Sequence, residues 1–99
     1  MSVDAFIAYL QLEKKYSPHT IKAYNKDITA FTSFCQDHHQ LNGIWNVNYP
    51  LIRNWIVYLV EKKVSNRSIN RKIASLKAYY RFLLKIGDID TDPLANHKA

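Results

Sequence analysis

The stretch SNRSINRKIASLKAYYRF, residues 65–82, combines an apolar helical face with many basic residues and no acid. Its apolar residues recur every three or four positions, which is the spacing of one face of an α-helix: Ile69, Ile73, Leu76 and Tyr80. The pattern predicts a core helix that is capped by Ser65 or Asn66 and ends at Ile86, before Gly87 as a left-handed C′ residue. Its basic face is either simply hydrated or lies against a polyanion.

Three further helices are expected upstream, over residues 3–15, about 18–37 and 50–63. Ser17 and Pro18 are a typical start for the second, since a hydroxyl caps the helix and proline fits its first position. Residues 38–48 are predicted to be a loop. The residues expected to face the core are Val3, Phe6, Ile7, Leu10, Tyr24, Ile28, Phe31, Cys35, Leu41, Ile44, Trp45, Ile52, Trp55, Ile56, Leu59, Val60, Leu83 and Leu84. The fold class is therefore all-α, a four-helix orthogonal bundle built from two helical hairpins, with room for one short extra helix.

Composition limits the classes of function. Ninety-nine residues form one domain, and the formal net charge is +6. From Lys62 to Gly87 there are eight Lys or Arg and no acid, whereas the rest of the chain has six bases and eight acids. Positive charge concentrated in one quarter of the sequence is typical of a nucleic-acid-binding face.

Two polar stripes are predicted opposite the core. On the last helix, a helical wheel centred on Ile69 places Arg67, Ser68, Arg71 and Ser75 on the far side, with Lys77 and Arg81 on a flank. On the second helix, His19, Thr20, Lys22 and Lys26 lie near the N-terminus. Long cations and hydroxyls near helix starts suit contacts with phosphates and base edges.

Other chemistry has little support in the sequence. The four histidines have no metal-ligand spacing, and we expect no cofactor and no metal. Cys35 lies among apolar residues and is interpreted as a buried hydrophobe rather than a nucleophile. No apolar run is long enough to span a bilayer, and the N-terminus lacks the features of a secretory signal, so we expect a cytoplasmic protein without a membrane partner.

Two segments resemble the N-terminal core-binding, SAM-like domain of tyrosine recombinases and phage integrases, including Xer-type enzymes. The first is SPHTIKAYNKDITAFTSF, where Ser17, Thr20, Ile21, Tyr24, Asp27, Ile28 and Phe31 match the family pattern. The second is SNRSINRKIASLKAYYRFLLKIGDIDTDPL, residues 65–94. It matches at Ser68, Ile69, Arg71, Leu76, Lys77, Tyr79, Tyr80, Phe82, Leu83, Gly87, Ile89, Asp92 and Pro93.

The resemblance implies a helical domain that forms half of a clamp around double-stranded DNA, with its second and fourth helices near the major groove. The DNA contacts that carry over are His19, Thr20, Lys22, Lys26, Arg67, Ser68, Arg71 and Ser75. Lys77 would contact phosphate or brace the helices. The family's tyrosine nucleophile, arginines and His-x-x-Arg motif belong to a separate C-terminal domain, so we expect this chain to be non-catalytic. Residues 1–87 would be the DNA-binding domain, and residues 88–99 the start of a linker.

The resemblance also implies other recombinase protomers as partners and no small-molecule substrate. Two other functions remain open from the residues alone. One is a helical module whose basic face binds an acidic protein. The other is a helix-turn-helix regulator, for which the helices on either side of the Val64-Ser65 turn are long.

Overall fold

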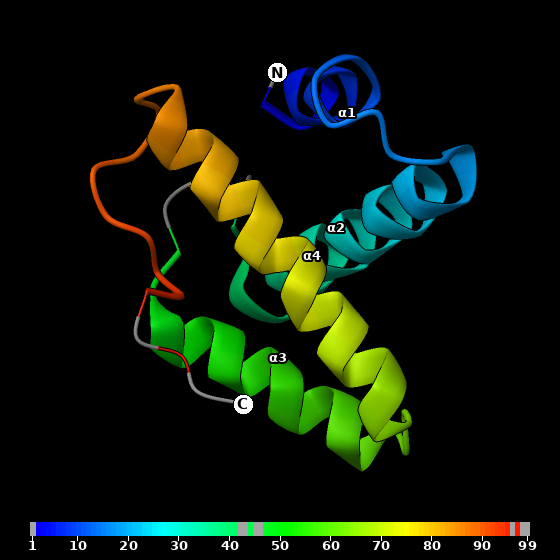
Figure 1. Ribbon diagram of the computed structural model, residues 1–99. Coiled ribbons are helices and arrows are strands. Elements are labelled where there is room, and N and C mark those ends of the chain that lie inside the picture. Colours follow the sequence, from blue (N-terminus) through cyan, green and yellow to red (C-terminus); the bar gives the residue numbers. More distant parts are fainter. Residues whose placement is uncertain (1, 42–43, 45–46, 96, 98–99) are drawn as a thin grey trace.

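The computed structural model describes residues 2–41, 44, 47–95 and 97, which contain four α-helices and no strand. They are α1 (Ser2–Leu12), α2 (Pro18–His39), α3 (Tyr49–Glu61) and α4 (Asn66–Lys85) (Figure 1). The all-α fold class is thus confirmed. Within the described residues, no helix combines the length and apolar character needed to cross a membrane.

The helix boundaries follow from local capping chemistry. Ser17 and Ser65 begin α2 and α4, because each Oγ accepts a hydrogen bond from the backbone N–H three residues later, at 3.2 Å. At the end of α4, Gly87 has a φ of 82°, and the N–H of Asp88 donates to the carbonyl of Leu83 at 2.9 Å. This is the left-handed C-terminal cap expected of glycine. Helix α1 ends at Leu12 rather than residue 15, and α3 ends at Glu61 rather than residue 63.

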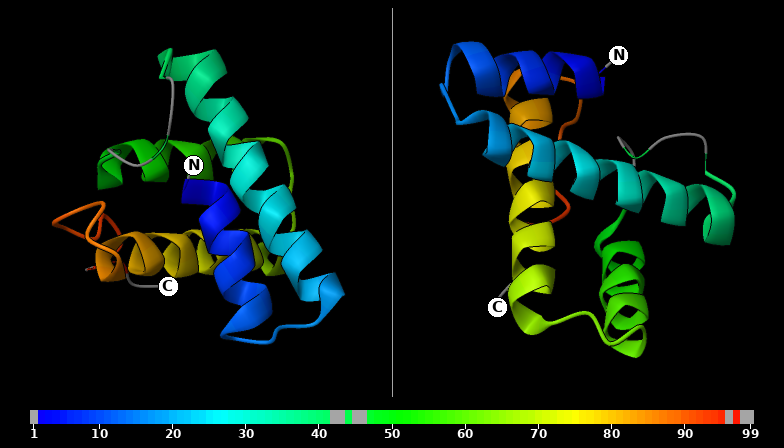
Figure 2. Two further views of the ribbon diagram at one scale, coloured as in Figure 1. Left: turned by 90° about the horizontal axis from the view of Figure 1, so that it is seen from above. Right: turned by 90° about the vertical axis from the view of Figure 1, so that its right-hand side faces the viewer.

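The helices form two pairs that cross steeply, as predicted for an orthogonal bundle (Figure 2). In the right-hand view, α1 and α2 run across the molecule, while α3 and α4 run along it. Helix α4 passes against both α1 and α2 and is the central element. A helix in this position buries a wide arc of its surface, which decides which of its residues remain free for a ligand.

The core is rich in aromatic side chains. Phe31 of α2 packs against Trp55 of α3 with ring centroids 4.9 Å apart, and Phe6 of α1 meets Tyr79 of α4 at 5.4 Å. Ile44 is buried and accepts a hydrogen bond from the Tyr80 hydroxyl through its carbonyl, so the loop before α3 is attached to the core. These contacts join all four helices and confirm that the loop contributes to the core.

Two residues expected in the core are exposed instead. Val60 is 56% exposed near the end of α3, and Leu84 is 42% exposed near the end of α4. Both lie in the last turn of their helix. Of the three loop residues predicted to plug the core, Leu41 is partly buried, and Trp45 lies outside the described residues.

The segment after α4 packs back onto the body of the domain. It runs from the end of α4 toward the start of α3 (Figure 1), and Leu94 within it is only 4% exposed. The Tyr49 hydroxyl and His97 Nδ1 are 2.9 Å apart and share a hydrogen bond. The domain boundary at residue 87 remains a prediction, but the sequence did not suggest that this polar segment would bury a leucine.

Candidate nucleic-acid interface

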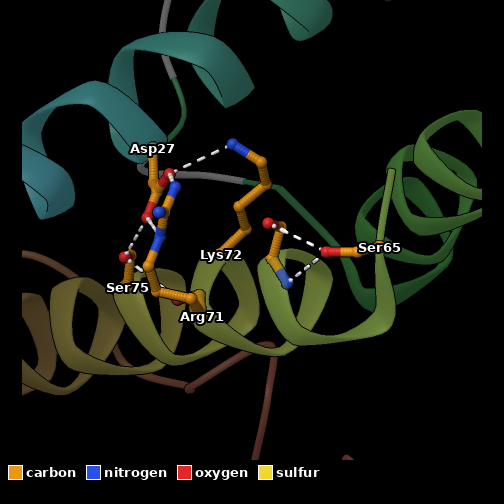
Figure 3. Close-up of polar contacts among 6 residues, drawn as sticks. Asp27, Ser65, Arg71, Lys72 and Ser75 are labelled. Carbon is orange, nitrogen blue, oxygen red and sulfur yellow. Dashed lines mark hydrogen bonds and ion pairs between the residues drawn. The ribbon is translucent and has the colours of Figure 1, made fainter. Parts of the chain in front are cut away.

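A buried carboxylate holds α2 against α4 where they cross. Asp27 of α2 is fully buried and accepts four hydrogen bonds from α4 (Figure 3). Arg71 donates through Nε at 3.1 Å and through Nη2 at 2.7 Å, Lys72 through Nζ at 3.1 Å, and Ser75 through Oγ at 2.8 Å. The two-pronged geometry of arginine fixes direction as well as distance. The polar cluster therefore sets the relative placement of the two helices.

The charges of this cluster do not cancel. Burial alone would raise the pKa of Asp27, but the hydrogen bonds from Arg71, Ser75 and Lys72 outweigh it and hold the pKa below its ordinary value. The same hydrogen bond raises the pKa of Arg71. One negative and two positive charges leave an excess of one positive charge at the crossing. The Arg71 side chain is still 45% exposed, so its remaining N–H groups can reach a ligand.

The structure corrects the predicted polar stripe on α4. Ser75 is not on the solvent side: it is fully buried and hydrogen-bonded to Asp27. Ser68 is half-buried, and its hydroxyl accepts a hydrogen bond from Ser65 at 3.1 Å. The residues of α4 that are exposed are Asn66, Arg67, Asn70, Arg71, Ala74, Arg81, Leu84 and Lys85.

The error has a clear physical cause. The helical wheel was centred on the aliphatic residues that begin with Ile69, but α4 also buries Tyr79 and Phe82 against α1. These aromatics widen the buried arc by about 100° toward Ser75. The centre of the exposed face moves by about 50°, so that Arg81 lies within it.

Lys77, which the helical wheel placed on a flank of α4, lies close to the C-terminal segment. Lys77 is half-buried. The pKa of His97 in the C-terminal segment is lowered mainly by the burial of His97 itself and, to a smaller extent, by the positive charge of Lys77. Lys77 is therefore close to that segment.

The stripe on α2 agrees better with the prediction. His19, Lys22 and Lys26 are all exposed, and Lys22 and Lys26 are one helical turn apart. Thr20 is half-buried, and its hydroxyl accepts a hydrogen bond from Ser17 at 3.0 Å. Because Asp27 directly follows Lys26, Lys26 lies close to the point where α2 meets Arg71 of α4, and Lys22 lies one turn earlier on α2. Exposed cations of both helices thus lie at or within about one helical turn of the crossing: Lys22 and Lys26 of α2, and Arg67 and Arg71 of α4. We refer to these four residues as the basic surface.

Sequence reasoning missed the role of Asp27, although a signal was present. Asp27 occurs on the apolar face of its helix, beside Ile28 and between Tyr24 and Phe31. A carboxylate on such a face is rarely buried unless it is paired. A basic partner on another helix could therefore have been expected. Its identity as Arg71 and Lys72 could not, because the pairing depends on how the helices cross.

Comparison with known proteins covers nearly the whole chain. Residues 3–87 match the family model described as phage integrase, N-terminal SAM-like domain. Tyrosine recombinase XerC of Oceanobacillus iheyensis is 40% identical over 91 residues, and XerC of Anoxybacillus flavithermus is 38% identical over 94 residues. Tyrosine recombinase XerD of Rickettsia bellii is 34% identical over 94 residues.

These alignments include 92%, 95% and 95% of this chain but only 30%, 31% and 30% of the respective relatives. The chain thus spans about a third of the length of the proteins that it resembles. No solved structure matches it. Together with the four-helix fold, the match over residues 3–87 shows that the chain belongs to the family of phage integrase N-terminal SAM-like domains.

Proposed function

We propose that this chain is the DNA-binding domain of a tyrosine site-specific recombinase and grips one half-site of duplex DNA with α2 and α4. The observation that carries the proposal is the Asp27–Arg71 contact, which places exposed cations of both helices at one crossing. These cations are the residues of the basic surface: Lys22, Lys26, Arg67 and Arg71. Cations at this surface would neutralise phosphates, and phosphate contacts dominate the affinity of such complexes.

The proposed contact set is narrower than the sequence suggested. His19, Thr20, Lys22, Lys26, Arg67, Ser68 and Arg71 retain some exposure and remain in it. Ser75 is left out, because a fully buried hydroxyl that already bonds Asp27 cannot reach DNA. For Lys77, which is half-buried, both a phosphate contact and a role in bracing the helices remain part of the proposal.

Asp27 would act as a positioning residue for this surface. It would touch no ligand, but it binds Arg71 of α4 one residue after Lys26 of α2. Two helices that approach one groove must keep a constant separation, and a buried, fully hydrogen-bonded ion pair provides it. The remaining parts of the proposal come from the family: strand cleavage would reside outside this non-catalytic domain, and other recombinase protomers would join it on DNA.

Duplex DNA binding measured against salt tests the proposal directly. If about five phosphates are neutralised, the logarithm of the association constant should fall with the logarithm of salt concentration at a slope of about −4.5. The double variant Lys22→Ala/Arg67→Ala should weaken binding and make the slope shallower by about two. Both side chains are exposed and have no ion pair within the described part of the chain, so the thermal midpoint should barely change.

A matched control removes two exposed cations elsewhere, Lys15→Ala/Arg53→Ala. It carries the same change in net charge but should retain the wild-type slope. Equal losses in the two double variants would mean that net charge rather than the α2–α4 surface drives binding. An affinity that is flat in salt would refute DNA binding through this surface.

A further inference from the structure

A small groove separates α1 from the C-terminal half of α4. It has a volume of about 210 Å³, and its floor is apolar and aromatic, formed by Phe6, Tyr9, Leu10 and Phe82. The Phe82 ring lies 5.0 Å from that of Tyr9 and 5.7 Å from that of Phe6, centroid to centroid. Phe6, Leu10 and Phe82 are buried as part of the core. The floor is therefore held in shape by the fold before any ligand arrives.

The rim of this groove is basic. Lys14 of the α1–α2 connection and Arg81 and Lys85 of α4 line it. The Nζ of Lys85 lies 5.0 Å from the centre of the Tyr9 ring, and that of Lys14 lies 5.9 Å from it, so both ammonium groups are within cation–π range.

No acid is among the residues that line the groove beside these three cations. The ion pairs of Asp27 with Arg71 and Lys72 do not involve them. The groove thus combines three basic side chains at its rim with an apolar floor.

We infer that this groove is a docking site for an acidic peptide segment of a partner protein, anchored by one large apolar side chain. The volume is below the roughly 300 Å³ at which small-molecule pockets begin, and it suits a single leucine, phenylalanine or tryptophan side chain. Carboxylates on either side of that anchor would meet Lys14, Arg81 and Lys85. The combination of a buried apolar anchor and a complementary charged rim is the usual anatomy of a binding site between proteins.

DNA fits this groove less well than a peptide. A phosphate backbone needs cations and N–H donors, but it has no apolar group that would fill a recess lined by Phe6 and Phe82. The groove also lies toward the C-terminal end of α4, about 15 Å or more along the helix from Arg67 and Arg71 if Arg81 and Lys85 are taken as its markers. The inference is independent of the proposed DNA binding, because it concerns other residues and can be measured without DNA.

The test is titration of the chain with a fluorescein-labelled peptide that carries a central Leu-Trp pair with Asp and Glu on both sides. Fluorescence anisotropy should show saturable binding, and amide NMR shifts should change around Tyr9 and Phe82. A peptide with the same acids but Ser-Gly at its centre should bind at least about tenfold more weakly, because it lacks the anchor.

Charge-reversal variants locate the site. Arg81→Glu/Lys85→Glu should weaken peptide binding by about tenfold or more. The control Lys26→Glu/Arg67→Glu has the same change in net charge but leaves the groove unchanged, so it should bind the peptide much more tightly than Arg81→Glu/Lys85→Glu. Ala78→Phe, which places a ring in the groove, should also abolish binding, with circular dichroism as the check on folding. The exposed residues Arg81 and Lys85 leave the core intact, so their variant remains informative if the Ala78 variant does not fold.

Three results would overturn the inference. They are the absence of peptide binding up to about 1 mM, equal affinity of the two charge-reversal variants for the peptide, and equal binding of the Ser-Gly peptide. Loss of duplex DNA binding in Arg81→Glu/Lys85→Glu, together with absence of peptide binding, would assign the groove to DNA instead. If Lys26→Glu/Arg67→Glu binds DNA normally while the peptide results hold, the DNA proposal fails and the groove proposal stands.

Discussion

Replacing Asp27 with asparagine removes one buried charge while keeping the size of the side chain. Because Asp27→Asn leaves no cavity, its effect reports on the polar cluster and not on packing. The amide oxygen can still accept two of the four hydrogen bonds, but the NH₂ group then faces the donors that bonded the other carboxylate oxygen, on Arg71 and on Lys72 or Ser75. Lys72 suffers most, since its side chain is only 14% exposed and loses its acidic partner.

The size of the effect follows from these exposures. Removing one partner of a buried ion pair costs about 3–5 kcal/mol, because the other charge stays buried. Arg71 is 45% exposed and can be hydrated again, which lowers the expected loss in the free energy of unfolding to about 2–3 kcal/mol. For a domain of this size, that lowers the melting temperature by about 10–20 °C. A total stability of about 5–15 kcal/mol would still leave the domain folded.

Urea and thermal denaturation followed by circular dichroism measure this loss. The control is Asp37→Asn, an exposed acid near the end of the same helix, which should change the free energy of unfolding by less than about 0.5 kcal/mol. In a Lys72→Met background, Asp27→Asn should cost about 1 kcal/mol less, since the stranded ammonium is gone. A loss no larger than that of the Asp37 control would refute the view that Asp27 ties α2 to α4.

Three further predictions concern buried groups. Because hydrogen bonds hold the pKa of Asp27 below its unfolded value, its contribution is full above that value and lost as pH falls through the folded pKa. Acid should therefore reduce the stability of the wild type more steeply than that of Asp27→Asn, and parallel pH profiles would contradict this. Tyr80→Phe leaves the Ile44 carbonyl without its donor and should cost about 1–2 kcal/mol in urea denaturation; an unchanged midpoint would argue against that bond. Burial raises the pKa of Cys35 to about 11, so a thiol reagent at pH 8 should label it far faster in urea than in the native state, and rapid native labelling would show that the site is open.

The sequence alone determined the helices and most of the core. Apolar spacing of three and four residues identified α2, α3 and α4. Ser17 and Ser65 marked the starts of α2 and α4, and Gly87 marked the end of α4. These features are local: a cap or an amphipathic stripe depends on neighbours within one or two turns of the same helix. Family patterns in two segments also identified the domain class, which the match over residues 3–87 confirms.

Only the tertiary structure decided which polar residues are available to a ligand. Arg71 and Ser75 looked alike on a helical wheel, yet one is half exposed and the other is sealed against Asp27. Burial depends on which helices cross, and those contacts join residues more than 40 positions apart in the chain. A periodic pattern gives the direction of a side chain about its own helix axis, but it cannot say how many neighbours cover that helix. Helix α4 is covered by both α1 and α2. Its contact with α2 buries the Asp27 carboxylate, and its contact with α1 forms the basic groove.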